Sequence, residues 1–117
     1  MNRYAAAGIS ADAAQGKRVI VITQDVRTSR EALEQIAQAT PTDVDMTVRR
    51  ANGAESVSYP TTGGEVIIRS YRQGARAYAA DILYLDEAVD PILRGTDAWA
   101  SLYANLATSQ HAEVIRA

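Results

Sequence analysis

The sequence predicts an α/β protein with three layers, in which helices cover both faces of a mainly parallel sheet. Two apolar runs without alternation, Val19–Thr23 and Ile82–Leu85, are typical of strands that are buried on both faces. Between and after these runs, apolar residues recur at helical spacing. In the middle of the chain they alternate with polar residues, which favours an antiparallel excursion from the sheet. We expect residues 1–117 to form a single domain.

A glycine, Gly16, marks the end of the first expected helix, and Lys17-Arg18 leads into the first expected strand. The alanine-rich stretch Arg3–Gln15 is expected to be helical, and Gly16 ends the helix because glycine adopts the left-handed cap conformation without strain. Val19–Thr23 is the most β-branched run in the chain, and β-branched residues favour strands. A loop over Asp25–Arg27 is expected to follow.

A second helix is expected after this loop. Thr28 and Glu31 have the spacing of a capping box, and an apolar stripe at helical spacing follows them. The helix is expected to end near Ala39, because Pro41 lies just beyond.

The middle of the chain has the pattern of short antiparallel strands. From Val44 onward apolar residues alternate with polar ones, and Asn52-Gly53 is a typical hairpin turn. Pro60–Gly64 is expected to be a second turn, followed by a strand over Glu65–Arg69. This section is therefore an antiparallel hairpin or meander of two or three strands.

The last third of the chain returns to the α/β pattern. A loop over Ser70–Ala80 leads into the buried strand Asp81–Leu85. Thr96 is expected to cap a helix, and His111–Arg116 is expected to be a final strand. The apolar face of that helix comprises Trp99, Leu102, Tyr103 and Leu106.

The composition excludes several classes of function. Lys and Arg number 12 against 14 Asp and Glu, and this net charge of −2 gives no electrostatic case for nucleic-acid binding by the whole surface. The sequence has no cysteine, which excludes disulfides and thiolate metal sites, and its single histidine excludes a histidine cluster. No apolar stretch approaches the roughly 20 residues that span a bilayer, so we expect no membrane partner.

Two adjacent carboxylates, Asp86 and Glu87, stand where the strand Ile82–Leu85 ends. Ligands of open α/β sheets bind at the carboxyl ends of strands. An apolar strand followed by Asp-Glu is also the Walker B pattern of P-loop nucleoside triphosphatases, in which the Asp holds Mg²⁺ and the Glu polarises the attacking water. The alternative is an acidic loop that caps a helix starting at Asp90-Pro91.

A series of motifs runs from Gly63 to Ala88. A Gly-Gly turn, the strand Glu65–Ser70, a loop containing Arg and Gly, and Ile82-Leu83-Tyr84-Leu85-Asp86-Glu87-Ala88 follow one another. This order resembles the ATPase domain of the large terminase subunit of tailed bacteriophages, and helicase-type and other motor ATPases are similar to it. The resemblance implies a partial P-loop fold, a Walker B pair at Asp86 and Glu87, and a phage-type protein in the cytoplasm of a bacterial host.

One motif of that superfamily is missing. Walker A, Gly-x-x-x-x-Gly-Lys-Ser/Thr, cradles the phosphates. The only Gly-Lys, Gly16-Lys17, lacks the first glycine, is followed by Arg18, and precedes a strand instead of following one. Compared with the layout of that family, the chain is expected to be a truncated ATPase-like domain that starts inside the helix after the P-loop. We therefore expect no cofactor and no bound metal, with Asp86 holding Mg²⁺ only where a nucleotide supplies further ligands.

Three functions stay open. The preferred one is a non-enzymatic remnant that self-associates or binds a protein through a sheet edge near Glu113–Ile115, which the loss of the P-loop strand would expose. The alternative is an ATPase or nucleotide-binding subunit that completes its Mg-ATP site from a partner chain. A third is a nucleic-acid-binding accessory protein. In it Arg69, Arg72 and Arg76 contact phosphate, although the same arginines could reach a neighbouring subunit or form a solvated loop.

Overall fold

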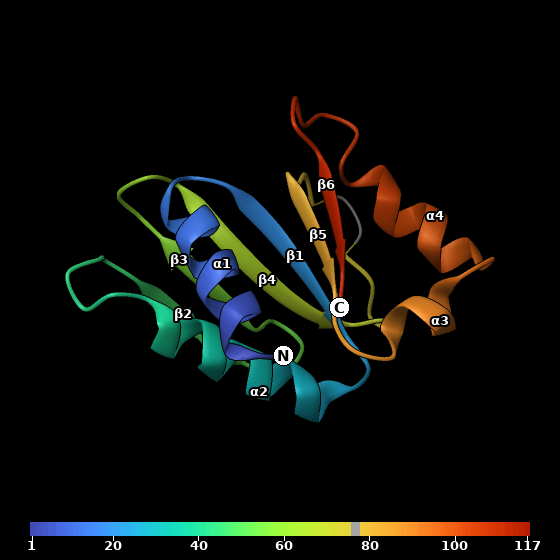
Figure 1. Cartoon of the computed structure of the whole chain (residues 1–117), viewed down its shortest axis with the longest axis horizontal. Helices are drawn as coiled ribbons and strands as arrows, with labels where there is room; N and C mark the ends of the chain where they lie inside the picture. Colours follow the sequence, from blue (N-terminus) through green and yellow to red (C-terminus); the bar gives the residue numbers. More distant parts are fainter. Residues whose placement is uncertain (76–77) are drawn as a thin grey trace.

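The computed structural model describes residues 1–75 and 78–117, and these contain four helices and six strands. The chain is an α/β protein whose strands form one mixed sheet, in the order β2-β3-β4-β1-β5-β6 (Figure 1). The elements are α1 (Arg3–Ala14), β1 (Arg18–Thr23), α2 (Val26–Ala39), β2 (Thr47–Arg49), β3 (Ser56–Tyr59), β4 (Gly64–Ser70), β5 (Ile82–Leu85), α3 (Val89–Leu93), α4 (Asp97–Ala104) and β6 (Glu113–Arg116).

The sheet combines a parallel part with an antiparallel part. β1 pairs in parallel with β4 on one side and β5 on the other, and β5 pairs in parallel with β6. β3 pairs in antiparallel fashion with β2 on one side and with β4 on the other. The predicted antiparallel excursion is confirmed, and its strand β2 forms one edge of the sheet. The β-branched strand β1 lies in the interior of the sheet, between β4 and β5.

Two helices, α1 and α2, cover one face of the sheet. Every second residue of β1 points toward them, so Val19 and Val21 are fully buried. From the helices, Ile9, Leu33 and Ile36 pack into the same cluster. Both helices contact β4 and β1, and Figure 1 shows the N-terminus close to the end of the sheet where the parallel strands have their carboxyl ends.

The other face of the sheet packs against α3 and α4. The alternate residues of β1 and β5, such as Ile20 and Leu83, form a second cluster with Leu93 of α3 and Leu102 of α4. Together the two clusters give the sheet a helical layer on each face, which is the three-layer arrangement that the sequence predicted.

Two details differ from the expectations. α2 begins at Val26, inside the stretch expected to be a loop, because Asp25 and not Thr28 is its N-cap. Tyr103, expected on the buried face of α4, is 55% exposed, because this short helix packs through Leu102 and leaves its neighbouring side chain in solvent. None of the helices in residues 1–75 and 78–117 has the length and apolar character that a bilayer crossing requires.

Candidate functional site

The candidate site lies where two neighbouring parallel strands, β1 and β5, continue toward opposite faces of the sheet. β1 leads into α2 on one face, whereas β5 leads into α3 and α4 on the other. In open α/β sheets ligands bind at the carboxyl ends of the two strands at such a reversal, and we call this position between the ends of β1 and β5 the crevice. Asp86 and Glu87 follow β5 at this point.

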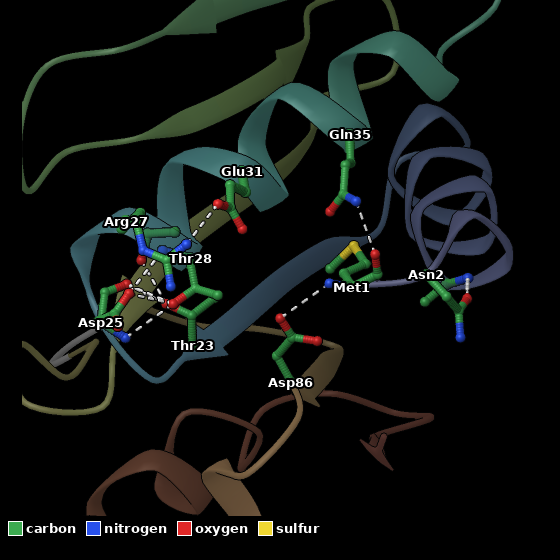
Figure 2. Close-up of polar contacts among 11 residues, drawn as sticks. Met1, Asn2, Thr23, Asp25, Arg27, Thr28, Glu31, Gln35 and Asp86 are labelled. Carbon is green, nitrogen blue, oxygen red and sulfur yellow. Dashed lines mark hydrogen bonds and ion pairs between the residues drawn. The ribbon is translucent and has the colours of Figure 1, made fainter.

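Asp86 is a buried carboxylate in this crevice, with 4% of its surface exposed. Its backbone N–H donates to the carbonyl oxygen of Ile22 at 2.9 Å, which continues the pairing of β5 with β1. Its Oδ2 lies 3.5 Å from the α-amino nitrogen of Met1 (Figure 2). Its Oδ1 is buried and has no hydrogen-bond partner among the described residues. Because a buried carboxylate is costly without a counter-charge, we identify the ammonium group of Met1 as its stabilising partner.

Met1 reaches Asp86 because α1 begins at this end of the sheet. The side chain of Asn2 caps α1 by accepting a hydrogen bond from the backbone N–H of Ala5 at 2.8 Å. The side chain of Met1 is fully buried, and its carbonyl oxygen accepts a hydrogen bond from Gln35 Nε2 of α2 at 2.8 Å. The positive end of the α1 dipole therefore lies on the same side of the crevice as the ammonium group.

Glu87 has different surroundings from its neighbour, because its side chain is exposed. Ala88 follows with a φ of 66°, a left-handed conformation that turns the chain into α3. Burial raises the pKa of Tyr84 to about 12, with the negative charges of Asp86 and Glu87 acting in the same direction. The site thus combines a buried structural charge with a solvated carboxylate that an approaching molecule can contact.

The loop after β1 forms the other wall of the crevice. Thr23 is fully buried, and its hydroxyl donates to the carbonyl oxygen of Asp25 at 3.1 Å. The Asp25 carboxylate accepts hydrogen bonds from the backbone N–H and the hydroxyl of Thr28, and these bonds lower its pKa (Figure 2). The carboxylate of Asp25 is therefore used to cap α2.

A separate cleft of about 410 Å³ lies at the carboxyl ends of β1 and β4. It includes Arg72, and among the described residues its lining contains neither Asp86 nor Glu87. The residues that line it are Gln24, Asp25, Val26, Ser70, Tyr71, Arg72 and Ile92.

The three arginines predicted as phosphate or inter-subunit contacts have different environments. Arg69 is half-buried, and its Nη1 donates to the carbonyl oxygens of Glu55 and Ile68, both at 2.8 Å. Burial lowers its pKa. Arg72 is exposed, and its Nε donates to the hydroxyl of Tyr71 at 3.1 Å. Arg76 lies outside the described residues.

The Asp86 carboxylate faces a positively charged group, whereas in a Mg-ATP site it would hold the metal ion. A Mg²⁺ ion at Asp86 would need further oxygen ligands, but Oδ2 faces an ammonium group 3.5 Å away. Within the described part of the chain, no three His, Asp or Glu side chains gather into a possible metal site. At the start of α1, the Asn2 side chain bonds a backbone N–H that a phosphate-binding loop would direct at the nucleotide.

Comparisons of this chain with protein-family models, with curated proteins and with solved structures each found no match.

Proposed function

We propose that this chain is a relative of the phage terminase ATPase domains that acts without hydrolysing ATP, through protein contacts and above all with a second copy of itself. Two observations support the proposal. The strand that ends in Asp-Glu resembles Walker B, and Asp86 faces the ammonium group of Met1. The proposal assigns Asp86 a structural role and places the functional surface at the neighbouring sheet edge.

The strand order supports this proposal. In the layout that the resemblance implies, the phosphate-binding strand lies beyond the last strand, on the side away from the Asp-Glu strand. Here β6 is the last strand of the sheet and pairs with β5 on its inner side. No strand within the described residues pairs with its outer side. The position that the missing strand would fill is thus an exposed edge.

The free edge of β6 is the observation that carries the proposal. The backbone N–H groups of Glu113 and Ala117 donate to the carbonyls of Asp81 and Leu85 in or next to β5, at 2.9 and 3.0 Å. Because successive residues of a strand direct their N–H and C=O groups to alternate sides, those of Val114 and Arg116 point outward. An edge of this kind is a template for pairing with another chain.

A second copy can pair with this edge in a register that places Ile115 on the symmetry axis. Two copies related by a two-fold axis perpendicular to the sheet bring their β6 strands together in antiparallel fashion. Val114 of one copy then exchanges both backbone hydrogen bonds with Arg116 of the other. Ile115, 36% exposed in the single chain, lies opposite its own copy on the axis, where the two apolar side chains shield each other from water.

Sedimentation over a wide concentration range tests the proposal. We expect a reversible dimer that Ile115→Lys shifts to monomer, because two ammonium groups would meet at the axis. Met46→Lys is the matched control: Met46 is 37% exposed but lies before β2 at the opposite edge, so this variant should dimerise normally. A wild-type chain that stays monomeric at every concentration, or equal behaviour of the two variants, would contradict the proposal.

A second candidate function is a nucleotide-binding subunit that completes its site from a partner chain. The exposure of Glu87 favours it, because a partner that brings a bound nucleotide could use this carboxylate to orient the attacking water. Its distinguishing result is ATP hydrolysis that appears on mixing with the partner and disappears in Glu87→Gln.

A further inference from the structure

A pocket of about 340 Å³, whose lining within the described part of the chain includes neither Asp86 nor Glu87, lies between α3, α4 and the end of β6. It combines a buried apolar side chain with one aromatic ring, two guanidinium groups and one carboxylate. The residues that line it are Asp90, Leu93, Arg94, Gly95, Trp99 and Arg116. Its volume falls within the usual range of small-molecule sites.

The charges in this pocket do not balance. The Asp90 carboxylate accepts from Arg94 Nη2 through Oδ2 and from Arg116 Nε through Oδ1, both at 2.9 Å. The two arginines lower the pKa of Asp90, so the carboxylate is charged at neutral pH. One negative charge therefore faces two positive charges, which leaves the pocket with a net charge of +1.

The arginines keep donors that Asp90 does not use. A guanidinium group has five N–H donors. Arg116 reaches Asp90 through Nε, and Arg94 reaches it through Nε and Nη2. The remaining N–H groups belong to side chains whose exposed fractions are 46% for Arg116 and 75% for Arg94. A planar fork of this kind suits the two oxygens of a carboxylate or a phosphate.

An apolar wall stands beside these donors. The guanidinium carbon of Arg116 lies 5.2 Å from the centre of the Trp99 ring, so the ring and the cation are adjacent. Trp99 is half-buried, and Leu93, which is 2% exposed, forms the floor. The Tyr103 ring lies 5.7 Å from the Trp99 ring, centre to centre, and Arg116 lies over Trp99. A flat apolar group would therefore contact the part of Trp99 that these two side chains leave exposed, while an acidic group on the same molecule meets the arginines.

We propose that this pocket binds a small organic anion, in which a carboxylate or phosphate group is joined to a flat apolar body. The pocket shares Arg116 with the edge proposed for self-association, but it uses the side chain of this residue, whereas the pairing of two copies uses its backbone. The competing explanation is that Arg94, Asp90 and Arg116 only hold α3 to β6. The two explanations predict opposite effects of removing the Asp90 charge on anion binding.

Trp99 reports on the pocket directly, because it is the only tryptophan of the chain. The probes are phenyl phosphate, benzoate and inorganic phosphate, titrated at low salt while tryptophan emission is recorded. We expect saturable changes with phenyl phosphate and benzoate and a dissociation constant on the order of 1 mM, as for ligands of this size. Inorganic phosphate, which cannot stack on Trp99, should bind at least about tenfold more weakly.

Variants separate the two explanations. Arg116→Gln and the more exposed Arg94→Gln should each weaken phenyl phosphate binding roughly tenfold, as loss of a charge-assisted hydrogen bond predicts. Asp90→Asn should strengthen it severalfold, because the competing carboxylate is gone. Arg50→Gln removes an exposed arginine that pairs with Glu34 elsewhere and should change nothing.

Several results would overturn the proposal. The first is that tryptophan emission of folded wild-type protein shows no saturable change with phenyl phosphate. The second is that phenyl phosphate binds no more tightly than inorganic phosphate. The third is that Asp90→Asn weakens the binding of phenyl phosphate. Circular dichroism verifies that each variant is folded, and calorimetry repeats the titrations without relying on Trp99 emission.

Discussion

The packing of α1 on the sheet depends on the absence of a side chain at Gly64. An ideal Cβ built at this position lies 1.7 Å from the carbonyl oxygen of Ala13 and 2.8 Å from its carbonyl carbon. Both atoms are backbone, so no side-chain rotation relieves the overlap. Gly64→Ala therefore forces the end of α1 away from β4, and α1 is the helix that brings Met1 to Asp86.

The size of this effect follows from the contact. Ordinary carbon–oxygen contacts are about 3.3 Å or longer, so the helix must move by about 1.5 Å. Overpacking of a well-filled core costs about 1–3 kcal/mol, and a backbone clash lies at the upper end. We expect Gly64→Ala to lower the free energy of unfolding by about 3 kcal/mol and Tm by about 10 °C in a domain of this size.

Urea unfolding followed by circular dichroism measures the change against two control variants. Gly63→Ala meets no atom within 4 Å but has a φ of +80°, so it should cost about 1 kcal/mol from left-handed strain alone. Gly8→Ala, within α1 and in open space, should stabilise by about 0.5–1 kcal/mol. A Gly64→Ala variant that loses no more stability than Gly63→Ala would refute the close approach of α1 to β4.

Three further predictions concern the crevice. Tyr84 has a pKa of about 12 in the folded chain, whereas an unfolded tyrosine titrates near 10. The folded state thus holds a proton that the unfolded state has lost, so the free energy of unfolding should fall between about pH 10 and pH 12, and Tyr84→Phe should remove this part of the slope. Ala88→Gly should raise stability by up to about 1 kcal/mol in urea unfolding, because glycine adopts a φ of 66° without strain. Asn2→Ala should lower the thermal midpoint through the loss of about 1 kcal/mol of capping energy, and an unchanged midpoint would exclude the cap.

The central strands of the sheet are predictable from the sequence because they are buried on both faces. Such strands need continuous apolar runs, so Val19–Thr23 and Asp81–Leu85 coincide with β1 and β5 to within one residue. The same pattern does not determine the order of strands. The edge near Glu113–Ile115, expected from the family resemblance and not from this pattern, is the edge strand β6 in the structure, and the crevice between β1 and β5 likewise follows from the strand order.

The start of α2 shows where local signals compete. Both Asp25 and Thr28 are good cap residues, and each has a plausible partner three positions on. In the structure Asp25 caps the helix and Thr28 returns the bond, while Glu31 pairs with Arg27 at 3.1 Å. The prediction chose the second of two overlapping capping boxes, because the sequence alone does not rank them.

The contact between Met1 and Asp86 is beyond sequence reasoning for a different reason. The two residues are far apart in the chain and meet only because α1 and β5 place them at one end of the sheet. The apolar run Ile82–Leu85 predicted the strand and placed Asp86 directly after its carboxyl end, as the structure has it. Which charge stands beside it depends on the packing of α1 and on Gln35, which no local pattern reveals.

The role of Asp86 is tested most directly by titration calorimetry of Mg-ATP into the purified protein, with Asp86→Ala alongside. If Asp86 is a buried structural charge, neither protein should release or absorb heat of binding. The variant should also unfold at lower urea concentration, because the ammonium group of Met1 loses its counter-charge. Micromolar binding of Mg-ATP that disappears in Asp86→Ala would contradict the account and make Asp86 a metal-holding residue.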